Sequence, residues 1–393
     1  MLDDVGAKEE SLCNRKMPKI YLYAELLLNI RQITVFAILP SSCNESTQIE
    51  LDADQKRLRL SHGDEEALIE LPCSALDNAN LKIPTVSTKE LSFRLAISGS
   101  ANLPGRLKPA TDNTIPWPAL KLTPETQLAC GCCGKRLVTD VKVWKDLPSG
   151  GWADMMDFWH CHKPTTENGN DASAGSNKGY AASKILGPRA GEGLVDVSYF
   201  LLAESDCTGI VAMSSQNLLK CSNCQRFVGV KDPDDGTFRL FKWNIKVQLS
   251  DDPTWEEYSV QEIVSAQLLA LIEEQATYRF VVYSGNVEEV QEALLLWVFT
   301  PDLLYATSTK PPQRAMKIFY TKIKDPSATL EKQNNKTEEL QLPNYALEKL
   351  QSDLKSSTNM LPPSAQKHQN WTIGLLPRLT HEELTPKAFA AAT

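Results

Sequence analysis

Two Cys-x-x-Cys pairs constrain this chain more than any other feature of its sequence. Cys130 and Cys133 form the first pair, with Gly134 directly after it, and Cys221 and Cys224 form the second. A Cys-x-x-Cys sequence on a tight turn directs two thiolates at one point, and two such turns complete a tetrahedral site with Zn–S distances of about 2.3 Å. The glycine allows the backbone to turn close to the sulfur. The sequence therefore predicts a structural zinc site held by these four cysteines.

The two pairs lie far apart, with 87 residues between Cys133 and Cys221. This separation is much longer than in a zinc finger. A zinc ribbon accommodates such an insert because each of its cysteine turns, or knuckles, is a self-contained unit. The alternative is two unrelated turns of reduced cysteines. Cys132 lies between two predicted ligands and is expected to point away from the site.

A third stretch between the pairs, Trp159-His160-Cys161-His162, offers further metal ligands. Cys161 and His162 can complete the zinc site in place of a knuckle cysteine. Alternatively, Cys161 is a reactive cysteine whose thiolate is favoured by a neighbouring histidine. A third interpretation is an exposed ligand pair that is offered to a metal in another protein. The remaining alternative is a buried aromatic residue with incidental polar neighbours.

Charge and composition exclude several locations and partners. The net charge is −8 and the pI is about 5.4, so we expect no direct binding of nucleic acid, which requires a basic face. The acidic, polar N-terminus is unlike a secretory signal. The apolar stretch 20–40 is interrupted by Glu25, Asn29 and Arg31, so we expect strands there and no membrane association. The expected location is the cytoplasm or the nucleus.

Several enzyme classes lack their motifs in this sequence. A zinc deaminase carries H-x-E followed by P-C-x-x-C, and no such pattern follows His160 or His162. The sequence contains no H-E-x-x-H, no P-loop and no G-x-S-x-G. With five histidines in the whole chain, a Ser-His-Asp triad is not expected.

We expect an α+β, β-rich protein in three consecutive parts. Residues 1–120 are predicted as an N-terminal β domain, because short apolar runs alternate with Pro, Asn, Asp and Gly turns. Residues 121–236 are predicted as a zinc-ribbon-like metal region, with a mobile Gly/Ser/Asn-rich insert at 163–193. Residues 237–393 are predicted as an α+β unit with a loose C-terminal segment.

Apolar periodicity predicts the individual elements. A helix is expected at Ser259–Gln275, where Ser259 and Glu262 form a capping box, and a shorter helix at Asn344–Lys355. Residues 326–341 are expected to be loose, and the last twenty residues give no clear signal. Strands are expected at Lys19–Tyr23, Ile33–Leu39, Ala67–Leu71, Leu91–Ile97, Leu194–Ala203, Thr237–Leu249, Thr277–Tyr283, Ala293–Thr300 and Ala315–Tyr320.

The cysteine pairs, the stretch at 159–162 and three downstream segments together resemble a known family. The downstream segments are Val264-Ser-Ala-Gln-Leu268, Tyr278-Arg-Phe280 and Leu295-Leu-Trp297. In this combination the chain is similar to the HECT-like ubiquitin ligases that carry a ubiquitin-conjugating-enzyme-binding domain. The likeness covers about residues 125–325, and the N-terminal β region matches in character alone.

The resemblance implies a ubiquitin-protein ligase. Such a protein accepts ubiquitin from a ubiquitin-conjugating enzyme and promotes its transfer to substrates for proteasomal degradation. The family's docking segment falls on 238–269, and its Trp-Cys-Cys-His motif falls on 159–162 with His160 in place of the first cysteine. The last cysteine of the chain is Cys224, so no HECT cysteine lies near the C-terminus. Cys161 is then the candidate catalytic cysteine, and a scaffold that never carries ubiquitin covalently fits equally well.

The same resemblance implies an alternative that is not enzymatic. The family is associated with inhibition of a zinc-dependent RNA 3′-end-processing nuclease, in which the motif cysteine reaches the partner's metal. In this interpretation the Cys161-His162 segment binds the active-site metal of that nuclease. A zinc-ribbon interaction module without either activity is the third hypothesis.

Overall fold

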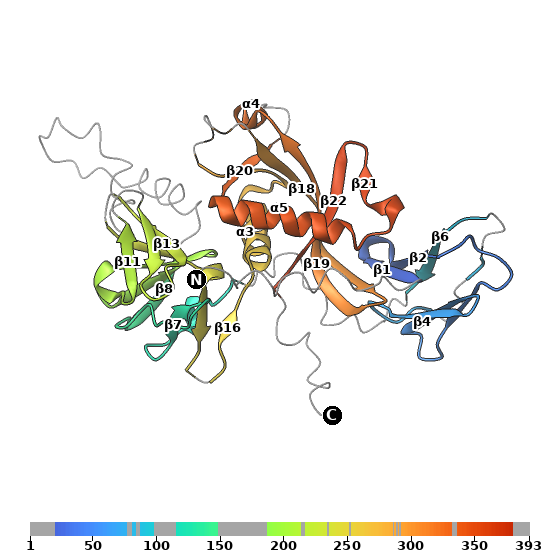
Figure 1. The fold of residues 1–393 in the computed structure, drawn as a ribbon, viewed down its shortest axis with the longest axis horizontal. Helices are drawn as coiled ribbons and strands as arrows, with labels where there is room; N and C mark the ends of the chain where they lie inside the picture. The colour runs from blue at the N-terminus through green and yellow to red at the C-terminus, as the bar shows by residue number, and fades with distance from the viewer. Residues whose placement is uncertain are drawn as a thin grey trace, which may run out of the picture. The chain divides into compact units, whose positions relative to one another are not determined.

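The computed structural model describes residues 20–76, 81–83, 87–97, 115–147, 187–213, 217–233, 236–250, 253–285, 287, 290, 292–331 and 336–379. The chain separates into two compact units (Figure 1). Unit 1 combines residues 1–110 with residues 279–393, and unit 2 comprises residues 111–278. Strands predominate in both, so the prediction of a β-rich protein is confirmed.

Unit 1 is built on a nine-stranded sheet that both ends of the chain form together. Its strands run in the order β21-β22-β19-β18-β1-β2-β6, and β17 and β20 pair beside β18. The N-terminal strand β1 is antiparallel to β18, with Tyr23 opposite Thr307. The strands are β1 (Tyr21–Leu27), β2 (Gln32–Ile38), β6 (Glu90–Ala96), β17 (Arg279–Tyr283), β18 (Ala293–Thr307), β19 (Lys310–Ile323), β20 (Glu338–Gln341), β21 (Lys367–His368) and β22 (Trp371–Pro377).

The pairing of β1 with β18 contradicts the division into three consecutive parts that was expected from the sequence. The N-terminal strands do not close a domain of their own, because a strand more than 250 positions later in the sequence supplies the partner of β1. The metal region and the helix at 260–275 instead belong to one unit.

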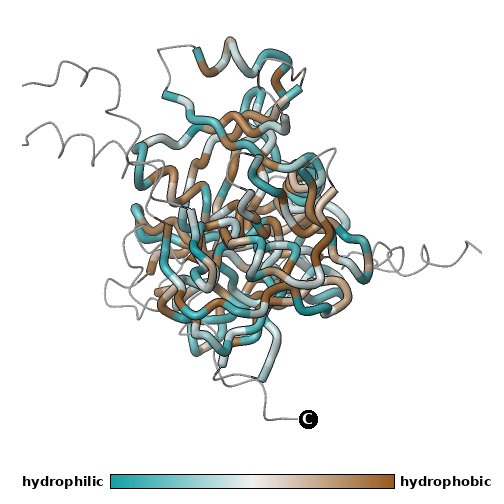
Figure 2. Tube along the Cα trace, turned by 90° about the vertical axis from the view of Figure 1, so that its left-hand side faces the viewer, coloured by the Kyte–Doolittle hydropathy of each residue, from teal (hydrophilic) through white to brown (hydrophobic). Residues whose placement is uncertain are grey.

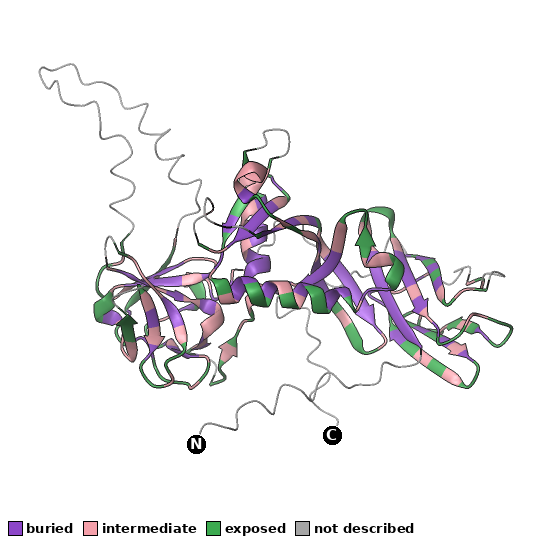
Figure 3. Cartoon of the chain, turned by 45° about the horizontal axis from the view of Figure 1, so that its top comes forward, coloured by how far each residue is buried: buried purple, intermediate pink, exposed green. Residues whose placement is uncertain are grey.

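Two further elements pack against the large sheet within unit 1. A three-stranded sheet of β3 (Gln48–Leu51), β4 (Arg57–His62) and β5 (Glu65–Glu70) shares a core with β1, β2 and β6, in which Leu22, Val35 and Leu60 are fully buried. Helix α5 (Asn344–Thr358) lies against β22, where Gly374 leaves room for the helix backbone. Buried and exposed positions alternate along β6, whereas six of the seven residues of β1 are buried (Figure 3). Apolar and polar residues are interspersed along the chain (Figure 2).

Unit 2 contains a seven-stranded sheet and a three-stranded sheet around one core. The orders are β11-β12-β13-β14-β10-β9-β8 and β16-β15-β7. Trp117, Phe200 and Leu240 are buried in this core together with Cys130 and Cys221. The strands are β7 (Gln127–Cys130), β8 (Val143–Asp146), β9 (Glu192–Val195), β10 (Tyr199–Leu202), β11 (Ile210–Met213), β12 (Leu218–Cys221), β13 (Phe227–Lys231), β14 (Phe238–Phe241), β15 (Ile245–Gln248) and β16 (Glu256–Glu257).

The expected helices are confirmed. Helix α3 (Val260–Gln275) begins after Ser259, whose side chain accepts the Glu262 N–H while the Glu262 carboxylate accepts the Ser259 N–H. Helix α5 starts at Asn344 as predicted and extends to Thr358. The short 3-10 helices are η2 (Leu28–Ile30), η3 (Ala119–Lys121), η4 (Glu204–Asp206), η5 (Lys242–Asn244) and η6 (Pro363–Ala365).

Several expected elements need correction. Residues 194–203 form two strands, β9 and β10, because a turn around Asp196 separates them. The strand expected at 237–249 is interrupted by η5. The segment 326–341 is not loose throughout, since it contains α4 (Pro326–Leu330), capped by Asp325, and β20. The C-terminal segment supplies β22, which the sequence did not indicate.

Residues 163–186 of the expected mobile insert lie outside the described residues. Residues 187–193 are described, and the last two of them begin β9. In the part of the chain that the structure describes, no helix is long and apolar enough to cross a membrane.

Candidate metal centre

The first cysteine pair lies on a tight turn at the end of β7. Cys130 is the last residue of the strand and is fully buried. The Cys130 N–H donates to the Lys135 carbonyl at 2.8 Å, and the Gly134 N–H donates to the Cys130 carbonyl at 2.9 Å. Gly134 has φ +72°, a conformation that glycine adopts without strain. The turn therefore brings Cys133 back beside Cys130.

The second pair repeats this geometry on β12. Cys221 is the last residue of that strand and is also fully buried. The Cys221 N–H donates to the Arg226 carbonyl at 2.9 Å, and the Gln225 N–H donates to the Cys221 carbonyl at 2.9 Å. Gln225 takes the place of the glycine with φ +58°. The two turns, here called knuckles 1 and 2, are thus equivalent although their sequences differ after the second cysteine.

A neighbouring segment supports each knuckle in the same way. In knuckle 1 the Gly131 N–H donates to the Asn244 carbonyl at 3.0 Å, and in knuckle 2 the Ser222 N–H donates to the Gly209 carbonyl at 2.8 Å. A Cβ on Gly131 would lie 3.1 Å from the Asn244 oxygen, so this approach leaves little room for a side chain. Backbone hydrogen bonds therefore fix both knuckles independently of any ion.

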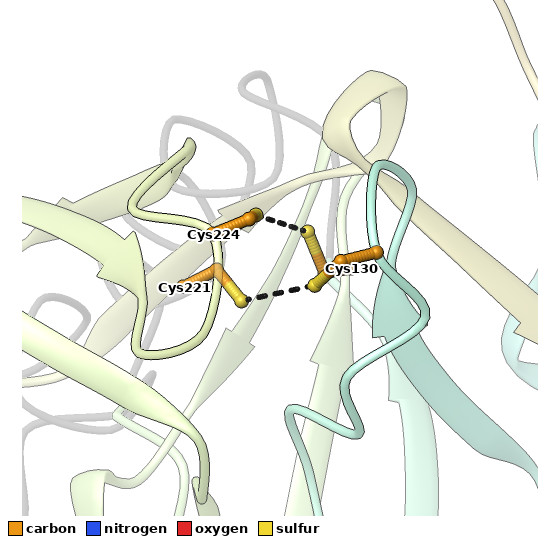
Figure 4. Close-up of side chains that lie close together, drawn as sticks. Cys130, Cys221 and Cys224 are labelled. Carbon is orange, nitrogen blue, oxygen red and sulfur yellow. Dashed lines mark hydrogen bonds between the residues drawn. The ribbon is translucent and has the colours of Figure 1, made fainter. Parts of the chain in front are cut away.

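The four sulfurs meet between the knuckles (Figure 4). Cys130 Sγ lies 3.7 Å from Cys224 Sγ, and Cys133 Sγ lies 3.6 Å from Cys221 Sγ. All four ligand atoms lie within 4.8 Å of one another. A tetrahedral ion with metal–sulfur bonds of about 2.3 Å requires sulfur–sulfur edges of about 3.8 Å, whereas a disulfide requires about 2.05 Å. The geometry therefore fits a bound metal ion better than paired disulfides.

The environment of the sulfurs gives them different proton affinities. Burial raises the pKa of the Cys130 thiol to about 12. A hydrogen bond from the Asn223 side chain lowers the pKa of Cys133 to about 6. Four thiolates this close repel one another unless a cation neutralises them, so metal binding would release protons from the set. Soft thiolate ligands in a tetrahedral set suit zinc or an iron–sulfur centre.

The remaining candidate residues do not join this cluster. Cys132 is exposed and lies outside the group of four. Cys207 is half-buried, and burial raises its pKa to about 12. Cys161 and His162 lie outside the described residues, so a role in metal binding or catalysis stays a prediction for both.

Several residues that shape the centre were not identified from the sequence. Asn223 has a direct effect on Cys133, and its place inside the second Cys-x-x-Cys was the available signal. Gln225 adopts a left-handed conformation that residue type alone does not indicate. Asn244 reaches knuckle 1 from a distant part of the chain, and no local pattern marks it.

Comparison with known proteins places the chain among relatives whose roles are not characterised. Residues 25–373 match the family described as HECT-like ubiquitin-conjugating enzyme (E2)-binding. An uncharacterized protein of Schizosaccharomyces pombe is 27% identical over 288 residues, which cover 69% of this chain and 79% of the relative. An uncharacterized protein of Saccharomyces cerevisiae is 25% identical over 264 residues, covering 65% and 71%. No solved structure matches the chain.

Proposed function

The chain belongs to the HECT-like ubiquitin-conjugating enzyme (E2)-binding family, and we propose that it is a ubiquitin-protein ligase. It would accept ubiquitin from an E2 and promote its transfer to substrates for proteasomal degradation. The observation that carries this proposal is the extent of the family match. It begins in β1 and ends in β22, so it includes strands of unit 1 from both ends of the chain and all of unit 2.

Zinc bound by Cys130, Cys133, Cys221 and Cys224 would have a structural role in this protein. Four protein thiolates fill a tetrahedral coordination shell, which leaves no position for a substrate. The site would join the ends of β7 and β12 and so hold the two sheets of unit 2 together. The spacing of the sulfurs, at 3.6 and 3.7 Å across the knuckles, supports this assignment.

The docking segment expected at 238–269 carries exposed aromatic surface suited to a protein partner. Trp255 is 38% exposed, and Lys246 Nζ lies 5.1 Å from the centre of its ring. Trp243 stacks on Phe241 with the ring centres 5.0 Å apart. Exposed tryptophans supply much of the binding energy in protein interfaces. We assign Trp255 as a contact residue for the E2.

Two mechanisms are compatible with these features. Cys161 would take ubiquitin in a thioester: its sulfur attacks the carbonyl carbon of the E2 thioester, and the E2 cysteine leaves as a thiolate. In the other mechanism the protein carries no ubiquitin and promotes direct discharge of the E2 onto a substrate lysine. The two mechanisms differ in whether a ubiquitin adduct on the protein forms.

The decisive experiment mixes the full-length protein with a panel of ubiquitin-charged E2 enzymes and follows discharge on non-reducing gels. Wild type is compared with Cys161→Ala, and Cys132→Ala serves as a control for another cysteine near the centre. A reducible adduct that Cys161→Ala abolishes supports the thioester mechanism, while discharge that survives supports the scaffold.

Two further results separate docking from catalysis. Trp255→Ala is expected to weaken E2 binding about tenfold, as loss of a central interface tryptophan does. Absence of both E2 binding and discharge for every member of the panel would overturn the proposed function.

A further inference from the structure

The strand β11 forms an exposed and uncharged edge of the seven-stranded sheet. It pairs with β12 on one side, and no other described strand pairs with its outer side. Its sequence is Ile-Val-Ala-Met, and Val211 and Met213 are 45% and 38% exposed. An apolar edge strand is a template for pairing with another chain unless charged residues or other elements cover it.

Hydrogen-bond alternation shows which groups of β11 face outward. The Ser222 N–H donates to the Gly209 carbonyl. Gly209 and Ser222 are therefore a hydrogen-bonded pair directly before β11. In an antiparallel ladder such pairs alternate with non-bonded ones. Val211 and Met213 therefore direct their backbone groups at β12, whereas Ile210 and Ala212 direct theirs away from it. An incoming strand would bond to Ile210 and Ala212.

Basic residues flank this edge. Lys220 is directly opposite Val211 on β12, so their side chains share one face of the sheet. The Lys135 side chain lies against Gly209, just before β11, with its Cε 3.2 Å from the position of a Cβ on that glycine. The segments 126–139 and 207–231 together hold five lysines and arginines and no acidic residue, although the whole chain is acidic. These five positive charges outnumber the two net negative charges that four thiolates around a divalent ion carry.

Three other edge strands contrast with β11. Charged residues occupy the edge strands β6, β8 and β16, namely Glu90, Arg94, Lys145, Asp146, Glu256 and Glu257. Such charges are the usual protection against edge-to-edge pairing. Beside β11 itself the protection comes from the flanking lysines, while residues 135–138 lie along the segment directly before the strand. Two copies of this edge would bring like charges together, so they would repel, whereas an acidic strand would be attracted.

We propose that β11 is a docking strand for an extended, acidic segment of a partner protein, which adds to the sheet beside knuckle 2. Backbone hydrogen bonds to Ile210 and Ala212 would provide the pairing, as in other cases of strand addition. Lys220 and Lys135 would select acidic side chains. This inference does not depend on ubiquitin transfer, because it rests on the edge and its charge.

The test uses full-length protein and two fluorescein-labelled peptides in a fluorescence polarisation assay. One peptide alternates glutamate with valine and the other alternates lysine with valine. Ala212→Pro removes an outward N–H without removing a bond to β12, so the sheet is expected to stay intact. Ala212→Val keeps the N–H and is the matched control. Thermal unfolding and metal content check that each variant is folded.

We expect the glutamate–valine peptide to bind wild type, and salt to weaken the binding because it screens exposed charges. Ala212→Pro should weaken it about tenfold, and Ala212→Val should not change it. Lys220→Glu should reverse the preference in favour of the lysine–valine peptide, and this result does not depend on how well the proline variant folds.

Four results would overturn the proposal. In the first, wild type and folded Ala212→Pro bind the glutamate–valine peptide equally, and in the second, wild type binds both peptides equally. In the third, wild type does not bind the glutamate–valine peptide up to millimolar concentration. In the fourth, Lys220→Glu leaves the charge preference unchanged. A wild-type dimer in sedimentation that Ala212→Pro dissociates would assign the edge to a second copy of the chain instead.

Discussion

Cys130 and Cys221 are more deeply buried than Cys133 and Cys224, but a tetrahedral ion would need all four sulfurs. Cys221→Ser removes the sulfur of one of the two fully buried cysteines, while the backbone bonds of knuckle 2 remain. We expect the variant to lose most of its bound zinc and to unfold at a lower temperature, because metal binding and folding are coupled. Elemental analysis and thermal unfolding measure the two effects. Cys132→Ser is the control and should retain the metal, and equal zinc content in both variants would contradict the assignment.

The burial of Lys242 predicts that the stability of unit 2 depends on pH. It is fully buried, its Nζ donates to the Pro116 carbonyl, and it lies 4.9 Å from the centre of the Phe200 ring. Burial lowers its pKa to about 7 from 10.5. Between these values the unfolded chain binds more protons than the folded chain, so Lys242 makes stability rise with pH from about 7 to about 10.5.

Comparison with Lys242→Met isolates this contribution from the titration of the cysteines. We expect the difference in unfolding temperature between wild type and variant to move in favour of wild type as the pH rises from 7 to 10. A difference that is independent of pH would show that the lysine stays charged in the folded protein, held by the carbonyl and the ring.

At this scale the sequence identified the four cysteines because Cys-x-x-Cys spacing is a local property. It did not identify Asn244 or Gly209, whose carbonyls support the two knuckles. Those contacts arise only when strands far apart in the sequence become neighbours.

At the scale of elements, helix α3 depends on the capping box at its start. Ser259 and Glu262 satisfy two N–H groups that have no partner within the helix. Ser259→Ala is expected to lower the free energy of unfolding by about 1 kcal/mol. Chemical denaturation measures the change, and the exposed Ser250→Ala provides a control outside the helix. A loss as small as that of Ser250→Ala would mean that the cap does not stabilise α3.

The helices were easier to predict than the long strands. Apolar periodicity and the cap located α3 to within a residue, since both are local signals. The prediction of β18 ended at Thr300, because the register against β19 shifts on both sides of that residue. A bulge breaks the alternation of side chains and therefore the pattern from which a strand is predicted. β20 is short and polar, and it becomes a strand only through parallel pairing with β17.

At the scale of the molecule, unit 1 depends on contacts between the two ends of the chain. The Lys317 ammonium lies 2.8 Å from a Glu25 carboxylate oxygen, and both side chains are largely buried. The Tyr23 hydroxyl donates to the same carboxylate at 3.0 Å. A buried charge without its partner is strongly destabilising. The sequence predicted three consecutive domains because no local pattern shows which distant strands pair.

This dependence predicts how fragments of the chain behave. Residues 1–110 alone are expected to be unfolded, because β1 lacks β18 and Glu25 lacks Lys317. Co-expression with residues 279–393 should restore a folded complex, measured by circular dichroism and by co-purification through a tag on one fragment. Lys317→Met in the second fragment should weaken the complex, since it leaves Glu25 buried without a counter-charge, whereas the exposed Lys322→Met should not. A folded, cooperative 1–110 fragment would show that the N-terminal strands form a domain of their own.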